Sequence, residues 1–202
     1  MTGRSHQRWS AIVLSVALAL TVLGCGQTEP SRLYTLSDLT TNKTAPNKPN
    51  GIAVGVGPVT LPQYLDRAQI VVRQSANRLE ASEFDRWAEP LKTTVPRVLT
   101  ENLSVLLVTD RVYSLPRRQR VALDYSVVID VARFEPTPAG TVSLVARWQI
   151  FGSDDKKRLA DGKTVVERDG AAPGDFEAMA ALMSDALIIL SRDIAKRIAE
   201  LQ

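Results

Sequence analysis

Apolar and polar residues alternate over two long stretches in the second half of the chain. Apolar side chains occupy every second position from 121 to 131, and the same spacing returns from 142 to 150. Such alternation is typical of β-strands with one buried face. The residues between them, PTPAG at 136–140, indicate a turn. The pattern therefore predicts a strand over 121–135 and an antiparallel hairpin, to which residues 159–168 add a third strand.

Shorter alternating segments lie closer to the N-terminus. Residues 52–61 predict one strand, which Pro58 confines or ends because proline cannot donate to a sheet. Residues 69–74 and 78–82 predict a hairpin around a short turn at 75–77. The segment RLYTL at 32–36 could form a further short strand.

Two other segments carry apolar residues at helical spacing. Apolar positions recur every three or four residues between 91 and 106, and Pro90 suits the first position of a helix. Pro96 removes one hydrogen bond and can kink a helix interior, so over 90–107 we expect a bent helix or one that starts late. A second stripe runs from Phe176 to Leu201 and predicts a terminal helix of about 25 residues.

Strands and helices in this order predict an α+β fold, in which an antiparallel sheet is covered on one face by two helices. The apolar stripes would then form its core. Residues 26–51 are rich in Thr, Asn, Pro and Lys, a composition typical of a flexible linker. About 150 residues follow, which is enough for a single core. We therefore place a signal peptide at 1–24, a lipidated N-terminus and linker at 25–50, and one domain at 51–202.

The N-terminus has the layout of an export signal. Its first eight residues include Arg4, His6 and Arg8 but no acid, and residues 11–23 are almost entirely apolar. A retained membrane-spanning helix is the alternative. A span needs about 20 predominantly apolar residues, whereas the strongly apolar part ends at Leu23. Export is therefore favoured.

The only cysteine of the chain, Cys25, follows this apolar segment directly. The residues Val22-Leu23-Gly24-Cys25 resemble the lipobox of bacterial lipoproteins, although Leu23 is larger than the usual occupant of its position. The resemblance implies cleavage before Cys25, a thioether-linked diacylglycerol on its sulfur and usually a third acyl chain, such as palmitate. Two or three chains anchor a protein stably, whereas one binds only marginally. Gly26, in place of Asp, favours the outer membrane by the rules of that class of protein.

Composition excludes several classes of function. Residues 1–24 carry two of the 25 basic residues and none of the 22 acids, so the remaining chain has a net charge of only +1, which gives no argument for nucleic-acid binding. The sole histidine, His6, leaves with the signal, and Cys25 would carry lipid. Hydrolysis of the Ser-His-Asp or Cys-His type therefore lacks its imidazole base, and zinc sites lack their usual Cys and His ligands. No phosphate-binding glycine motif is present. We expect no metal and no cofactor beyond the covalent lipid. Three chemistries stay open: a Ser/Lys nucleophile, a metal site made only of carboxylates, and a glycosidase with two carboxylates. The glycosidase candidates are Asp66, Glu80, Glu83, Asp85 and Glu89.

Three phrases resemble one known family. They are VGPVTLPQYLDRAQIVVR at 56–73, NRLEASEFDRWAEPL at 77–91 and ALMSDALIILSRDIAKRI at 181–198. The chain is similar over about 32–199 to the ABC-type transport auxiliary lipoproteins, which include the lipoprotein subunit of the paraquat-inducible system. LPQYLDR and FDRWAEPL are the most specific parts, since generic amphipathicity does not produce their spacing.

The resemblance implies a non-enzymatic lipoprotein, anchored in the outer membrane with its domain in the periplasm. It would serve as the auxiliary or docking subunit of an ABC- or MCE-type envelope lipid transport system and would contribute to membrane integrity. Its expected partners are an MCE-type lipid-binding protein and the associated permease and ATPase, and a homo-oligomer would match a ring-shaped partner. The alternative is a periplasmic carrier that binds a lipid or another small molecule.

The two specific phrases also supply candidate partner-binding residues. Tyr64, Leu65, Asp66 and Arg67 could form an exposed loop, since Tyr and Arg are common in interface hot spots. Asp66 and Arg67 could instead hold a turn together. Arg86 and Trp87 are the candidates of the second phrase. Here the structural alternative is that the Trp87 ring packs on the sheet while Asp85, Arg86 and Glu89 order the helix entry.

Overall fold

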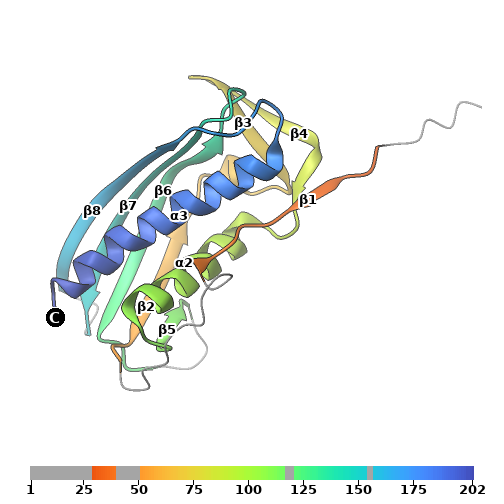
Figure 1. Cartoon of the computed structure of the whole chain (residues 1–202). Helices are drawn as coiled ribbons and strands as arrows, with labels where there is room; N and C mark the ends of the chain where they lie inside the picture. Colours follow the sequence, from red (N-terminus) through yellow and green to blue (C-terminus); the bar gives the residue numbers. More distant parts are fainter. Residues whose placement is uncertain (1–28, 40–50, 117–120, 154–156) are drawn as a thin grey trace, which may run out of the picture. The chain divides into compact units, whose positions relative to one another are not determined.

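The computed structural model describes residues 29–39, 51–116, 121–153 and 157–202 (Figure 1). Internal contacts divide the chain into residues 1–30 and residues 31–202, and every element described below lies in the second unit. The signal peptide, Cys25 and most of the linker fall outside the described residues. What we expect of them therefore stays a prediction.

The larger sheet has five strands in the order β5-β2-β6-β7-β8. The strands are β2 (Val54–Thr60), β5 (Val112–Ser114), β6 (Tyr125–Pro136), β7 (Val142–Gly152) and β8 (Arg158–Arg168). The antiparallel β6-β7-β8 meander confirms the predicted hairpin and third strand. However, β2 runs parallel to both β5 and β6, so the sheet is mixed. Parallel neighbours need a crossover connection, and here the chain between β2 and β6 supplies one.

The longest predicted alternation is interrupted by a β-bulge. Val131 pairs with Ala146 and Arg133 with Val145, so one extra residue of β6 lies between the two pairs. A bulge of this kind reverses which positions face the core. Val127, Ile129 and Val131 are buried as the alternation predicts, but beyond the bulge the strict alternation ends, since Phe134, Glu135 and Pro136 are all buried.

The smaller sheet has the order β1-β4-β3. Its strands are β1 (Arg32–Tyr34), β3 (Gln69–Ser75) and β4 (Arg78–Trp87), and a 3-10 turn, η3 (Gln63–Leu65), precedes β3. The antiparallel β3–β4 pair confirms the second predicted hairpin. β1 pairs in parallel with the end of β4, so the RLYTL segment does form a strand.

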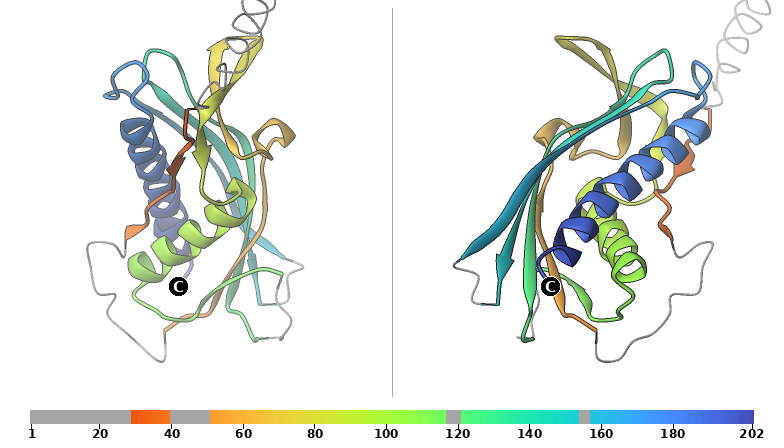
Figure 2. Two further views of the ribbon diagram at one scale, coloured as in Figure 1. Left: turned by 90° about the vertical axis from the view of Figure 1, so that its right-hand side faces the viewer. Right: turned by 60° about the vertical axis from the view of Figure 1, so that its left-hand side comes forward.

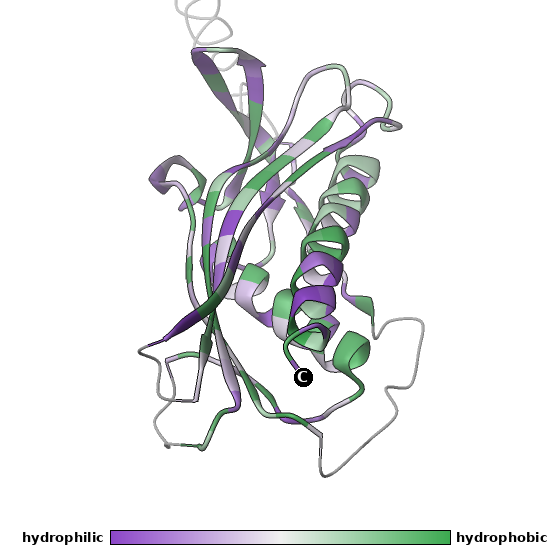
Figure 3. Ribbon diagram, turned by 90° about the vertical axis from the view of Figure 1, so that its left-hand side faces the viewer, coloured by the Kyte–Doolittle hydropathy of each residue, from purple (hydrophilic) through white to green (hydrophobic). Residues whose placement is uncertain are grey.

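Two α-helices, α2 (Leu91–Leu107) and α3 (Phe176–Ala199), lie on the same face of the larger sheet (Figures 1 and 2). α3 packs over β6, β7 and β8, α2 packs against β2 and β5, and the helices also contact each other. Figure 3 shows apolar residues spread along both helices and alternating with polar residues along the strands. The helix over 91–107 continues through Pro96, with Pro90 as its N-cap. The predicted α+β fold with two helices on one sheet face is confirmed.

The N-terminal segment belongs to the domain. Leu36 is buried in the common core. The backbone N–H of Ser37 donates to Ser184 Oγ at 3.0 Å, and that of Leu39 donates to Asn102 Oδ1 at 2.8 Å. The domain therefore includes residues 31–39, which lie on the linker side of our boundary at residue 51. The polar residues that follow, at 40–50, conceal this short apolar segment in the composition.

Candidate functional site

Tyr64 and Arg73 both bind one buried carboxylate. The side chain of Glu135 is 1% exposed, and its Oε1 accepts from Arg73 Nε at 2.5 Å. Its Oε2 accepts from Tyr64 Oη at 2.7 Å and from the backbone N–H of Phe134 at 2.9 Å. Because Tyr64 lies in η3, Arg73 in β3 and Glu135 in β6, this network joins the smaller sheet to the larger one.

The environment of Tyr64 keeps its hydroxyl protonated. Burial, followed by the hydrogen bond and charge of Glu135, raises the pKa of Tyr64 to about 12, and the opposing effect of Arg73 is smaller. The pKa of Arg73 is also raised, mainly by its hydrogen bond to Glu135. A tyrosine held in this way is a fixed donor within the fold, so its hydroxyl is committed to a structural contact.

The rest of the LPQYLDR phrase divides into buried and exposed residues. Leu65 is 3% exposed and packs in the core, so its side chain is not available to a partner. Asp66 pairs with Lys92 at 3.0 Å, and both side chains are about half exposed. Arg67 is exposed. Asp66, Arg67 and the start of α2 therefore form the accessible part of this loop, beside a cleft of about 230 Å³ next to Lys92.

A second buried carboxylate, Asp85, holds the N-terminal strand. Arg32 donates to it through Nε at 2.8 Å and through a terminal nitrogen at 3.2 Å, and Tyr34 Oη donates at 2.9 Å. Ser82 Oγ adds a further hydrogen bond at 2.7 Å. Burial alone would raise the pKa of Asp85, but the hydrogen bonds from Arg32, Ser82 and Tyr34 outweigh it and lower that pKa. Since both oxygens are engaged and the acid stays ionised, Asp85 is unsuited to the proton-donor role of a glycosidase pair.

Arg86 and Trp87 of the FDRWAEPL phrase lie on opposite faces of β4, because successive side chains of a strand alternate. Trp87 is 5% exposed and lies in the core, as the structural alternative predicts, so its ring is not accessible to a partner. Arg86 is half-buried and sits beside Leu33 and Gln69 on the neighbouring strands. Its Nε is buried with no hydrogen-bond partner among the described residues. Of the six candidate residues, Asp66, Arg67 and Arg86 thus keep polar groups that are not committed to the core.

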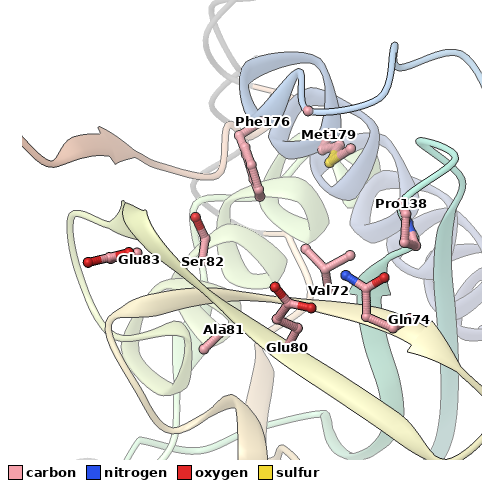
Figure 4. Close-up of a pocket in the computed structure, with 10 residues that line it drawn as sticks. Val72, Gln74, Glu80, Ala81, Ser82, Glu83, Pro138, Phe176 and Met179 are labelled. Atoms are coloured by element: carbon pink, nitrogen blue, oxygen red, sulfur yellow. The ribbon is translucent and has the colours of Figure 1, made fainter. Parts of the chain in front are cut away.

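A cleft of about 400 Å³ opens between the β3–β4 hairpin, the β6–β7 turn and the start of α3 (Figure 4). Phe176 and Met179 of α3 lie across it from Val72, Gln74 and Glu80 of the hairpin. Both apolar and polar residues line the cleft, and the polar ones include the carboxylates of Glu80 and Glu83. Sequence reasoning missed it because only the fold brings these segments together, and Phe176 and Met179 look like ordinary core positions of a helix.

The helix-free face of the larger sheet carries an apolar groove of about 610 Å³. Ser126 and Val128 line it, and they alternate along β6 with Val127 and Ile129, which face the helices. The remaining lining residues are Gly57, Pro58, Leu115, Pro116 and Phe151. The polar cleft and the apolar groove therefore lie in different parts of the domain.

Neither a metal cluster nor a membrane-spanning helix is found in the described part of the chain. No group of three or more His, Cys, Asp or Glu side chains there could hold a metal ion. No helix among residues 29–39, 51–116, 121–153 and 157–202 is long and apolar enough to cross a bilayer.

Comparisons with known proteins converge on one family. The family model described as the ABC-type transport auxiliary lipoprotein component matches residues 34–195. The sequence matches none of the curated proteins. Among solved structures, an uncharacterized protein superposes with a TM-score of 0.68 at 18% identity, over 84% of this chain and 99% of that one. Protein XCC0632 from Xanthomonas campestris superposes with a TM-score of 0.64 at 20% identity, over 82% and 93% of the two chains. At these identities the two structures support the fold alone.

Proposed function

Because the chain belongs to the ABC-type transport auxiliary lipoprotein family, we propose that it is a non-enzymatic docking subunit of an ABC- or MCE-type envelope lipid transport system, anchored in the outer membrane. The family description itself places the chain with an ABC-type transport system. The outer membrane, the MCE-type partner and the contribution to membrane integrity are the further steps of the proposal.

One observation carries the proposal: the lipobox cysteine and the domain that matches the family lie almost next to each other in the chain. Residues 26–31 separate Cys25 from β1, and the hydrogen bonds of Arg32 and Tyr34 to Asp85 fix that strand in the domain. A lipid on Cys25 would therefore hold the family domain directly at a membrane. Such an arrangement suits a protein that receives a transporter component there.

Metabolic labelling with radioactive palmitate tests the anchor. The wild-type protein should be labelled, and Cys25→Ala should not be, because no other cysteine is present to replace it. Equal labelling of both proteins would contradict the anchor. Membrane fractionation then tests the predicted location. The wild type should be found in the outer membrane, and the Gly26→Asp variant should shift toward the inner membrane.

Affinity purification of the lipidated protein tests the docking role. It should recover an MCE-type protein together with its permease and ATPase. Arg67→Glu should weaken this recovery, because Arg67 is exposed beside the Asp66–Lys92 pair and its replacement leaves the core intact. Lys163→Glu is the matched control, since Lys163 is also exposed but lies on strand β8 of the other sheet. Preparations that never retain an MCE-type protein or a permease would count against the proposal. A partner that binds both variants equally well would count against the use of this loop in docking.

The size of the purified assembly tests the expected homo-oligomer. A closed ring would allow identical subunits to meet a ring-shaped partner with matching symmetry. Light scattering of the lipidated protein in detergent should then give a defined multiple of the protomer mass. A strictly monomeric protein at all concentrations would remove this part of the proposal.

The apolar groove favours one alternative, a carrier that binds a lipid or small molecule. Its volume of about 610 Å³ is within the range of ligand pockets, and most of its lining is apolar. Native mass spectrometry of protein purified from membranes should then show one bound lipid per chain. Val128→Trp should displace that lipid by filling the groove, whereas Val165→Trp, at an exposed position of β8, should not. Protein that carries no lipid would favour docking over transport of cargo.

A further inference from the structure

The connection between the proposed anchor and the first strand is short. Between Cys25 and Arg32 there are seven Cα-to-Cα steps, which reach about 25 Å at most when fully extended. This inference rests on the proposed lipidation of Cys25. If the lipid is present, Arg32 must stay within that distance of the bilayer surface.

The chain after Arg32 adds no flexible length to this connection, because β1 is held in the domain at several points. Arg32 and Tyr34 both bind the buried Asp85, and β1 pairs along its length with the end of β4. Leu36 is then buried in the core. The short connection therefore constrains the position of the whole domain, and the end of the domain that carries β1 must lie close to the membrane.

The surface at this end exposes one large apolar side chain. Leu33 is 66% exposed, the largest exposed fraction of any large hydrophobic residue in the described chain. It borders a groove of about 430 Å³ between residues 33–37 and the first turns of α3. Glu177 is the only charged residue of that lining, which otherwise consists of Leu33, Tyr34, Thr35, Ser37, Ala180, Ala181 and Ser184.

We propose that the β1 end of the domain rests on the lipid bilayer, with Leu33 inserted into its interfacial region and the groove beside α3 turned toward the lipid headgroups. One leucine would bind a vesicle only weakly from solution. Attachment through the short connection makes that contact intramolecular and raises its effective concentration. Arg32 and Arg86 are the neighbours of Leu33, but a zwitterionic bilayer has no net charge to attract them, and no cation lines the groove. The contact should therefore depend on apolar burial and should resist salt.

The direction of α3 gives the proposal a consequence for the rest of the domain. α3 begins beside β1, where the rings of Phe176 and Tyr34 lie 6.3 Å apart, and its 24 residues rise about 36 Å to Ala199 (Figures 1 and 2). The end of α3 at Ala199 should therefore be exposed to the aqueous side, where a periplasmic partner can reach it.

Spin labelling of the lipidated, full-length protein in vesicles of zwitterionic phospholipid tests the proposal. The thioether on Cys25 leaves no free thiol, so Leu33→Cys introduces the only site for a nitroxide. Thr35→Cys, also exposed and also in the groove, serves as a second site, and Ala199→Cys is the matched control at the far end of α3. The label at 33 should be several-fold more accessible to oxygen, relative to a water-soluble nickel complex, than the label at 199. The label at 35 should be shielded from nickel, and neither result should change at high salt.

Three other results overturn the proposal. The first is an equally aqueous environment at 33, 35 and 199 in protein whose intact mass shows the lipid, a result that leaves the proposed anchor standing. The second is shielding at 33 and 35 that appears only as the protein density in the vesicles rises, which assigns the surface to a second copy. The third is protein without lipid by mass, which removes the anchor of the proposed function and this inference with it.

Discussion

Replacing Asp85 by Ala should destabilise the domain by about 2–3 kcal/mol, because hydrogen bonds to a charged acceptor each contribute about 1.5–3 kcal/mol and do not add fully. The Asp85 side chain is 3% exposed and accepts from Arg32, Tyr34 and Ser82. The contribution of Arg32 is discounted because its side chain is 55% exposed and can return to water. For a domain of this length, the loss corresponds to a decrease in Tm of about 4–12 °C.

Urea unfolding of the purified protein measures this loss. Glu83→Ala is the matched control, since Glu83 is an exposed acid two residues earlier in β4 and its removal should change stability by less than about 0.5 kcal/mol. Arg32→Ala and the double variant complete a thermodynamic cycle that isolates the Arg32–Asp85 coupling. If Asp85→Ala is no more harmful than Glu83→Ala, Asp85 does not hold β1 in place and the reasoning fails.

The pH dependence of the same experiment tests the ionisation of Asp85. Its pKa is lower in the folded protein than the reference value of 3.8, so the folded state binds the proton less readily than the unfolded state. The stabilisation is therefore complete above that reference value and is lost as the pH falls through the lower, folded pKa. The stability difference between wild type and Asp85→Asn should shrink in this acidic window. A difference that is constant from neutral pH to below pH 3 would show that the pKa of Asp85 is not lowered.

Three further variants test other contacts of the fold. Tyr64→Phe should cost about 1–2 kcal/mol by removing a donor to the buried Glu135. Because the pKa of Tyr64 is raised from 10.0 to about 12, wild type should also lose stability between those pH values, and alkaline unfolding should show that Tyr64→Phe loses less. Gly162→Ala would push a methyl group into the Trp148 ring and should cost about 1–3 kcal/mol, with altered tryptophan fluorescence. Asn102→Ala should cost about 1–3 kcal/mol and speed proteolysis of the N-terminal segment, because the fully buried amide oxygen of Asn102 accepts a hydrogen bond from the backbone N–H of Leu39.

Elements whose burial follows a simple period could be predicted from the sequence. The β6–β7 hairpin, β8 and both helices emerge because alternation and helical spacing report directly which side chains face a core. The parallel position of β2 between β5 and β6 could not be predicted in this way. A strand's own pattern tells which face is buried but not which distant strand lies beside it.

The contacts of the candidate site are harder to predict from the sequence, because they join residues that are far apart in it. Tyr64 and Glu135 are 71 positions apart, and Arg32 and Asp85 are 53 apart. The phrases LPQYLDR and FDRWAEPL supply the candidate partner-binding residues, but Leu65 and Trp87 are core residues. One available signal was Glu135 itself: it follows Phe134 directly at the end of a predicted strand with an apolar face, and an acid that is buried there needs a partner.

The two buried carboxylates bear on how an anchored docking domain could work. Glu135 fixes η3 and β3 to the larger sheet, and Asp85 fixes β1, the first strand after the proposed anchor, to β4. The smaller sheet is therefore connected on one side to the core and on the other to the segment that leads to the membrane. If either connection were loose, a lipid on Cys25 would keep the domain near the bilayer without fixing its orientation. With both in place, β1 and the exposed surfaces of the smaller sheet keep a fixed geometry relative to the larger sheet, so that a transporter component would meet one constant surface on the domain.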